Sequence, residues 1–525
     1  MANPQLNNEK GYALLVVLLV ISLISILGLG LMGLTVNSMN FVNANKNLLE
    51  SKTVAEQEVD ETMAKIQEEI GDLNSNLDRG VADIDFVINQ IDALLNNLET
   101  SLANGQRLER RLINDGSEGV YLERVDLFIP LEDSSRSLVH TFTFSTIADV
   151  FRYSAVSPGN MYLNGAPYIN GDMYVGGNLR LDNYAEYIYG GYEREKTSWP
   201  AIEGDLTVKD NYEYLYIWLL NWYREFDPVP FNLEKYFSVI PNISEEEPAI
   251  TPINVIEHIN GKNYDLDPYD QFNSKQVGTY NNKNKNTVIN SDMKYRELRV
   301  KGNGSLTIKG DLVVEDSLTM EQGSYLAVEG SIQVKGSADL SGTLRIKKEN
   351  HLYIENNADI ENLDMEGKMY INGRVLIENE LNTNSTIYVR NGGEIRNLSN
   401  NVNGGTLVVI SDDSLQVSNN NLYNPEPKVM DAYLYTNSEL EMFGVGSNIQ
   451  INGGLYGDPV ILNAVKGDTR EGYRDLIFES DQDSIPPEKS RLSIYYKDDL
   501  ILNPPDGIPT VEKVTLKELD SQFVE

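Results

Sequence analysis

An uninterrupted apolar run near the N-terminus constrains this chain more than any other feature. Residues Tyr12 to Val36 are 25 in a row without a charged side chain. As a helix they would extend about 37 Å, and the hydrocarbon core of a bilayer is about 30 Å thick. The run passes into polar residues, Asn37 and Ser38, and lacks the small-residue cleavage site that ends a secretory signal peptide. We therefore predict a transmembrane helix at 12–36, a single-pass location in the cell membrane and an extracellular C-terminal domain.

The residues around the start of this run follow a recognisable order. Asn8 to Leu23 reads NEKGYALLVVLLVISL, which is a polar leader with a basic residue, a glycine, an aromatic residue and then the apolar helix. This order resembles the N-terminus of a type IV prepilin, and it is most similar to PilX-type minor pilin-like proteins. The resemblance covers about the first sixty residues.

The resemblance implies a processing reaction. A prepilin peptidase would remove residues 1–11 by cutting between Gly11 and Tyr12, Tyr12 would be methylated, and Lys10 would help to hold the leader in the cytoplasm. Prepilins usually carry Glu at the fifth mature position, which is Val16 here. A carboxylate inside a membrane is costly and is kept where assembly uses it, so Val16 favours a minor pilin over a major one. The implied partners are the bilayer, the peptidase and other pilin-like subunits. An uncleaved signal-anchor helix is the alternative.

Composition excludes several classes of partner and chemistry. The chain has 43 Lys and Arg against 79 Asp and Glu, a net charge of −36, so we expect no nucleic-acid partner. It has no Cys, which excludes disulfides and thiolate metal sites. A length of 525 residues exceeds one compact core, so two or three folded units are expected.

Composition and periodicity change several times along the chain. We predict eight segments, which are a leader at 1–11, a transmembrane helix at 12–36, an amphipathic helical stalk at 37–115, a small β linker region at 116–157, first β repeats at 158–210, an aromatic helix and loop insertion at 211–286, a β-solenoid at 287–465, and a C-terminal strand and tail at 466–525.

The predicted stalk has a seven-residue apolar spacing. Ile70, Leu77, Ile84, Ile91 and Leu98 follow each other at this interval, which indicates an amphipathic helix that packs against another helix. Two arrangements satisfy the pattern. One is a helical hairpin within the chain, and the other is a coiled coil between chains.

The second half of the chain is repetitive with a period near six. Leu306, Leu312 and Leu318 are six apart, and Ile332 and Leu344 belong to a further run with the same step. Short strands that turn at Gly, Asn or Asp after each hexad predict a β-solenoid with three faces, about 18 residues per coil, and roughly seven coils over residues 287–417. The texture is similar to that of bactofilins, which implies a right-handed, triangular parallel β-helix. A sandwich of hairpins is the alternative, because Asn-Gly pairs are frequent.

An aromatic segment, Tyr212 to Phe237, interrupts the repeats, and its centre is expected to be helical. The helix would cover the end or side of the solenoid. Alternatively, Trp218 and Trp222 would form an exposed aromatic surface for a carbohydrate or a partner subunit.

No arrangement of residues predicts catalysis, a metal site or a cofactor. His140, His258 and His351 are far apart and lack the spacing of metal ligands. The function we predict is that of a membrane-anchored, surface-exposed, pilin-like structural protein of a type IV pilus or a related assembly system. The alternative is an anchored adhesin that binds a cell-wall polymer or glycan without a pilus role. A β-helix enzyme acting on polysaccharides is a third, weaker alternative.

Overall fold

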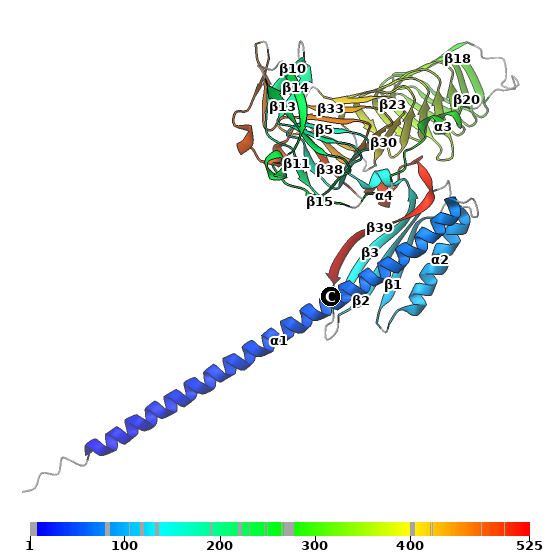
Figure 1. Ribbon diagram of the computed structural model, residues 1–525. Coiled ribbons are helices and arrows are strands. Elements are labelled where there is room, and N and C mark those ends of the chain that lie inside the picture. The colour runs from blue at the N-terminus through cyan, green and yellow to red at the C-terminus, as the bar shows by residue number, and fades with distance from the viewer. Residues whose placement is uncertain are drawn as a thin grey trace, which may run out of the picture. The chain divides into compact units, whose positions relative to one another are not determined.

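The computed structural model divides the chain into two compact units (Figure 1). The first contains Met1–Thr146 and Val511–Glu525, and the second contains Ile147–Thr510. The predicted fold class, helices followed by a β-solenoid, is confirmed. The structure describes residues 8–78, 84–103, 105–115, 120–131, 136–188, 192–218, 223–229, 232–245, 247–248, 250–263, 266, 278–399, 405–419, 422, 424–473, 475–497 and 499–524.

Two helices dominate the first unit. Helix α1 (Asn8–Asp78) is continuous over 71 residues, and no proline lies between Pro4 and Pro130 to interrupt it. Helix α2 (Ile84–Ser101) contributes to the same apolar core as the second half of α1. The buried side chains of α1 in this core recur every three or four residues, at Ala55, Val59, Met63, Ile66 and Ile70. Of the two arrangements that the heptad spacing allowed, the structure has the hairpin within the chain.

These helices pack on a four-stranded sheet with the order β1-β2-β3-β39. Its strands are β1 (Arg107–Asp115), β2 (Tyr121–Pro130), β3 (Ser137–Ile147) and β39 (Thr510–Val524). Two expectations need correction. The helical part of the stalk ends at Ser101, because residues 107–115 pair with β2 instead of continuing the helix. The polar C-terminal tail is a strand, because Val514 and Leu516 alternate toward the core of this unit.

One asparagine ties the returning C-terminal strand to α1. The side-chain amide of Asn74 donates to the carbonyl of Val514 at 2.8 Å, and its oxygen accepts the Val514 N–H at 2.9 Å. Both backbone groups of Val514 are therefore satisfied by a single side chain from 440 residues away in sequence.

The second unit is a parallel β-solenoid of about 14 turns. Its strands form three stacked faces. Paired residues on one of them, which we call face A, are 17 to 20 positions apart, close to the predicted coil length; they are Met293, Leu312, Ile332, Leu352, Met369 and Ile387. The apolar interior is formed by side chains such as Leu312 and Ile332, which have no exposed surface. The right-handed sense of the coil stays a prediction.

The solenoid strands have the following bounds. In the first repeats they are β4 (Ala155–Ser157), β5 (Met161–Gly165), β6 (Tyr168–Asn170), β7 (Met173–Val175), β8 (Leu179–Asp182), β11 (Ala201–Glu203), β12 (Asp205–Val208) and β15 (Asn242–Ser244). In the central coils they are β16 (Thr279–Lys283), β17 (Asn286–Ile289), β18 (Met293–Lys301), β19 (Ser305–Ile308), β20 (Leu312–Met320), β21 (Tyr325–Val328), β22 (Ile332–Val334), β23 (Ser337–Ile346), β24 (His351–Ile354), β25 (Ala358–Glu366), β26 (Lys368–Ile371), β27 (Val375–Asn382), β28 (Thr386–Val389), β29 (Gly393–Ser399), β30 (Leu407–Ser411) and β31 (Leu415–Ser418). The last coils contain β32 (Lys428–Thr436), β33 (Leu440–Gly444), β34 (Ile449–Tyr456), β35 (Val460–Ala464) and β38 (Leu492–Tyr495).

The first repeats stack on the last coils. Strand β4 pairs with β34, β5 with β35, and β6 with β38, all in parallel. Figure 1 shows the early strand β5 and the late strand β33 in the same part of the solenoid, where β35 pairs with both. The repeats predicted at 158–210 are thus part of the same solenoid as the coils after residue 428, and not a separate block.

Three antiparallel hairpins project from the coils. They are β9 (Tyr184–Ile188) with β10 (Tyr192–Lys196), β13 (Tyr212–Trp218) with β14 (Tyr223–Pro228), and β36 (Thr469–Glu471) with β37 (Leu476–Phe478). The second hairpin replaces the helix expected in the aromatic segment. Tyrosine, tryptophan and isoleucine favour strands, and the first residues of β13 extend the solenoid by pairing in parallel with β8.

A connecting segment crosses the outside of face A. After β15 the chain passes through α3 (Val255–Asn260) before it enters β16. The N–H of Ile253 donates to the hydroxyl of Tyr435 at 2.8 Å, the ring of His258 stacks on Tyr388 with centroids 5.0 Å apart, and the N–H of Leu266 donates to Gln333 at 3.2 Å. We call residues 250–263 and 266 the strap. It buries aromatic side chains that would otherwise face solvent.

Candidate functional site

The apolar part of α1 is the first candidate site. Leu14–Met39 has a mean hydropathy of 3.0, and all 26 of its side chains are exposed. Three of its hydroxyl groups bond to carbonyls one turn earlier in the helix: Ser22 donates to Leu19 at 2.9 Å, Ser25 to Ile21 at 2.8 Å and Thr35 to Leu31 at 2.9 Å. A helix with its polar groups satisfied internally suits a hydrocarbon environment. By length and composition, this segment is able to cross a membrane or to act as a signal sequence.

The predicted processing residues lie at the start of this helix. The backbone of Lys10, Gly11 and Tyr12 belongs to α1, and their side chains are outside the described part of the structure. The leader before Asn8 also lies outside the described residues. The structure thus shows that the helix runs without a break from the predicted cleavage site into the apolar segment. Cleavage between Gly11 and Tyr12 stays a prediction.

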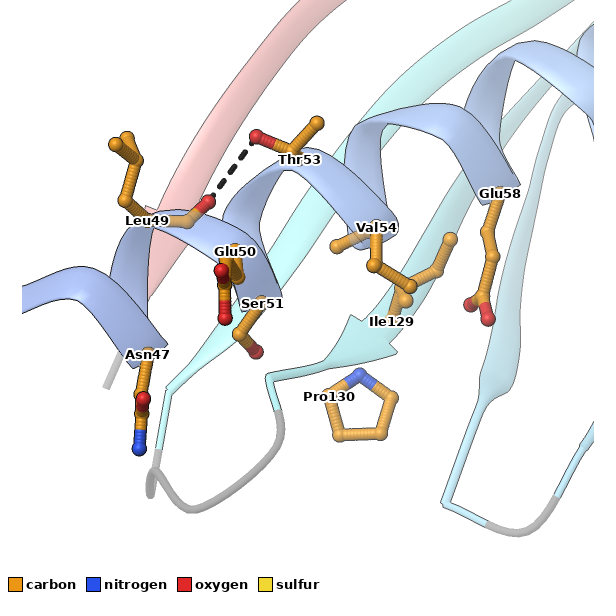
Figure 2. Close-up of a pocket in the computed structure, with 10 residues that line it drawn as sticks. Asn47, Leu49, Glu50, Ser51, Thr53, Val54, Glu58, Ile129 and Pro130 are labelled. Atoms are coloured by element: carbon orange, nitrogen blue, oxygen red, sulfur yellow. Dashed lines mark hydrogen bonds between the residues drawn. The ribbon is translucent and has the colours of Figure 1, made fainter.

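A groove of about 710 Å³ lies on α1 after the apolar segment (Figure 2). Consecutive turns of α1 between Asn47 and Glu58 line one side of the groove. Ile129 and Pro130, at the end of β2, line the other part. Leu49 is 66% exposed and Val54 is 54% exposed, so apolar surface continues along α1 beyond the membrane segment. The groove offers apolar contacts with carboxylates at its rim, and no nucleophile paired with a base.

A buried ion pair holds α2 to the sheet of the first unit. The Arg110 guanidinium donates to Glu123 at 2.7 Å and also pairs with Asp92 of α2. Glu123 is 2% exposed and accepts a second hydrogen bond from the hydroxyl of Tyr121. Burial, with help from Glu123, raises the pKa of Tyr121. A tyrosine with a raised pKa stays neutral, so this network stabilises the fold and offers no base.

The structure does not bring the predicted tryptophan surface together within the described residues. Trp218 ends β13, its side chain is not described, and Trp222 lies outside the described residues. The described part of the hairpin covers Arg180, whose guanidinium lies 4.8 Å from the ring of Phe226 and pairs with Glu213 at 2.8 Å. This part of the segment packs on the solenoid, as the covering role predicted.

A cavity of about 300 Å³ opens on face C, where strands β31, β33, β35, β5 and β8 are stacked. Gln416 and Ser418 of β31 and Phe443 of β33 line it from the solenoid, and Tyr187 of β9 and Leu476 of β37 line it from the two hairpins. Nothing in the sequence pointed to this cavity, because its residues come from strands up to 289 positions apart. We call it the face C cavity.

A more polar cavity of about 550 Å³ lies beside Arg491. The Arg491 guanidinium is buried and donates to the backbone carbonyls of Ser447 at 2.7 Å and Gly467 at 3.3 Å. Burial lowers the pKa of Arg491 to about 10. These contacts hold three loops of the last coils together.

The three histidines are separated in the structure as they are in the sequence. His140 belongs to the first unit, His258 lies in helix α3 of the strap, and His351 lies on strand β24 of the solenoid. Among the described residues, no group of three or more His, Asp or Glu side chains is placed to hold a metal ion.

No protein-family model matches the chain, and no curated protein sequence matches it. Among solved structures, the competence-associated pilin ComZ from Thermus thermophilus is similar at 11% identity and a TM-score of 0.20, over 81% of this chain and 88% of that one.

Proposed function

We propose that this protein is a membrane-anchored, pilin-like structural protein that presents its solenoid outside the cell. The continuity of α1 supports the proposal most directly. One helix has a fully exposed apolar segment at Leu14–Met39 and, without a break, an amphipathic segment that is buried against a sheet from Ala55 to Ile70. A rigid connection of this kind fixes a folded domain to a membrane helix, which is the geometry that display or filament entry needs.

The leader provides the second support. Lys10, Gly11 and Tyr12 precede the apolar segment in the order that a prepilin peptidase requires, by resemblance. We propose that the peptidase cuts between Gly11 and Tyr12, and that other pilin-like subunits are the partners in the membrane. The role is structural and not catalytic.

The N-terminus of the protein in its native membranes tests the proposal. Mass spectrometry of the most N-terminal peptide is expected to find Tyr12 first in the wild type and Met1 in a Gly11→Val variant or in a strain without the peptidase. Gly28→Ala is the matched control, because a Cβ at Gly28 meets nothing within 4 Å, and it should be processed normally.

Other outcomes contradict the proposal in distinguishable ways. Wild-type protein that keeps Met1 would be a plain signal-anchor protein with no pilin processing. A mature chain that begins after Val36 would mean that the apolar segment is a removed signal sequence. Release of the protein from membranes by alkaline carbonate would exclude the anchor itself.

A further inference from the structure

The polar cavity of about 550 Å³ beside Arg491, which we call the Arg491 cavity, has the size of a ligand site. Ligand pockets commonly have volumes of about 300–1,000 Å³ and combine aromatic surface with a small number of fixed polar groups. The floor of this cavity comes from neighbouring strands of one solenoid face, where β34 pairs with β38 and Gln450 lies opposite Ser493. Tyr495 lies two residues further along β38 and also lines the cavity.

The aromatic part of the floor is supported from the solenoid. The ring of Tyr495 packs against the ring of Tyr168, with centroids 5.5 Å apart and an interplanar angle of 57°. Tyr168 is buried and belongs to β6, the next strand of the same face. Tyr495 itself stays partly exposed. A supported tyrosine with open surface offers apolar contact to a ligand at little cost in side-chain ordering.

Two buried cations hold loops at the rim of the Arg491 cavity. Arg491 is 2% exposed and donates to the backbone carbonyls of Gly467 and Leu422, both at 3.3 Å. Lys466 is 1% exposed and donates from its Nζ to the carbonyl of Ile485 at 2.8 Å. Burying a cation against neutral carbonyls costs stability, and proteins accept such costs mainly at functional sites.

Two further side chains hold the rest of the rim. Asn448 is buried, and its amide donates to the carbonyl of Pro425 at 2.9 Å. The carboxylate of Glu479 accepts a hydrogen bond from the N–H of Asp468 at 3.0 Å. Each rim segment, at 425–427, 467–468, 479 and 484–491, is thus tied by a hydrogen bond between a side chain and the backbone. A rim that is already ordered lowers the entropy cost of binding.

The charges around the cavity disfavour an acidic ligand. The carboxylates that line it are Glu426, Asp468, Glu479 and Glu488, and the cations are Lys489 and Arg491. Part of the negative charge is already engaged, because Asp468 favours the charge of Arg491 and Glu479 accepts the backbone N–H. Carboxylates accept hydrogen bonds from hydroxyl groups and repel anions. An uncharged ligand with many hydroxyl groups therefore fits this lining.

We propose that the Arg491 cavity binds an uncharged oligosaccharide, with one sugar ring packed on Tyr495 and its hydroxyl groups bonded to Ser493 and Glu488. The C–H face of a pyranose ring is apolar and matches an aromatic ring, and its hydroxyl groups match neighbouring donors and acceptors. This inference goes beyond the display role and does not depend on cleavage of the leader.

Titration calorimetry of the full-length protein, in a non-ionic detergent without a sugar head group, tests the proposal. The probes are N,N′-diacetylchitobiose and α-1,4-galactobiose. Their acidic counterparts are the disaccharide of N-acetylglucosamine and N-acetylmuramic acid, and α-1,4-digalacturonate. At least one uncharged probe is expected to bind, and at least about tenfold more tightly than its acidic counterpart. The probe that binds identifies the kind of sugar.

Three variants separate the cavity from the rest of the surface. Tyr495→Leu is expected to weaken binding of the uncharged probe by about tenfold, because the aromatic ring is lost. Glu488→Lys is expected to reduce the preference for the uncharged probe over its acidic counterpart, because it replaces a negative charge by a positive one. Tyr325→Leu is the matched control, because Tyr325 is a 37% exposed tyrosine on β21, several coils away, and it should bind like the wild type.

The proposal fails if neither uncharged probe binds or if the acidic counterparts bind equally well. It also fails if Tyr495→Leu keeps wild-type affinity at an unchanged melting temperature, or if Glu488→Lys leaves the preference between the two members of a pair unchanged.

Discussion

Single asparagines turn the solenoid at one corner. Asn362, Asn379 and Asn397 have φ angles of 51°, 66° and 52°, and they follow each other by one coil. Side chains with a Cβ are strained in this left-handed region, and asparagine tolerates it better than most residues. The frequent asparagines of the repeats were therefore informative about corners, although no sequence rule showed which of them adopts a positive φ.

Substitution of Asn379 measures this effect. Both Asn379→Gly and Asn379→Ala lose the 2.8 Å hydrogen bond from the asparagine amide to Glu361, so their difference isolates the backbone strain. We expect Asn379→Ala to be less stable than Asn379→Gly by about 1 kcal/mol, measured by thermal unfolding. Equal stabilities would mean that the corner relaxes out of the left-handed region.

His351 makes the stability of the solenoid depend on pH. Burial, together with the charges of Lys262 and Lys368, lowers its pKa from 6.5 to about 4. The folded state therefore favours the neutral ring. The resulting contribution of His351 to the free energy of unfolding is fully present above pH 6.5. As the pH falls from 6.5 to 4, protonation of the unfolded chain removes up to about 3 kcal/mol of this contribution.

A His351→Gln variant tests this pH dependence. Subtraction of the variant's free energy of unfolding from that of the wild type, measured at several pH values, removes the contribution of the carboxylates. The wild-type free energy of unfolding minus that of the variant is expected to decrease as the pH falls from 6.5 to 4. A difference that is flat in this range would place the pKa of His351 near its ordinary value.

At the scale of elements, periodicity predicted those features that repeat and missed those that occur once. The six-residue step of Leu306, Leu312 and Leu318 predicted the coil length, because every coil must bury the same interior positions. The aromatic segment was wrongly predicted as a helix although tyrosine and tryptophan favour strands, because the partner strand β8 is remote in sequence. The face C cavity was missed for a similar reason, since the hairpins that wall it are placed by tertiary contacts.

The attachment of β39 to α1 can be tested at Asn74. Replacement by alanine leaves the N–H and carbonyl of Val514 without their side-chain partner, and an unsatisfied buried backbone group costs about 1–3 kcal/mol. We expect Asn74→Ala to increase hydrogen exchange across β39, measured by mass spectrometry. Ser75→Ala, on the exposed side of α1, is the control. Unchanged exchange in both variants would show that pairing with β3 alone holds β39.

At the scale of the whole molecule, the order of coils in space differs from their order in sequence. Strand β4 pairs with β34, so Ala155 and Leu455 are partners across 300 residues of chain. Neighbouring coils between β18 and β31 pair over short sequence distances instead. No sequence pattern revealed this arrangement. All coils have the same pattern of apolar interior residues, so the pattern does not indicate which coils are neighbours.

The arrangement predicts an order of folding. Contacts between distant segments cost more chain entropy to form, so the central coils should become protected first. Pulse-labelling hydrogen exchange during refolding is expected to show protection of 312–396 before 155–182, and protection of 155–182 together with 449–464. Early protection of 155–182 on its own would contradict this order.

The same arrangement has a mechanical consequence. The chain leaves the sheet of the first unit after β3 and returns to it in β39, and these two strands are neighbours in that sheet. The solenoid is thus attached by two covalent tethers and not by one. A single proteolytic cut in either tether leaves it attached through the other, and a pulling force on the displayed domain is divided between two strands.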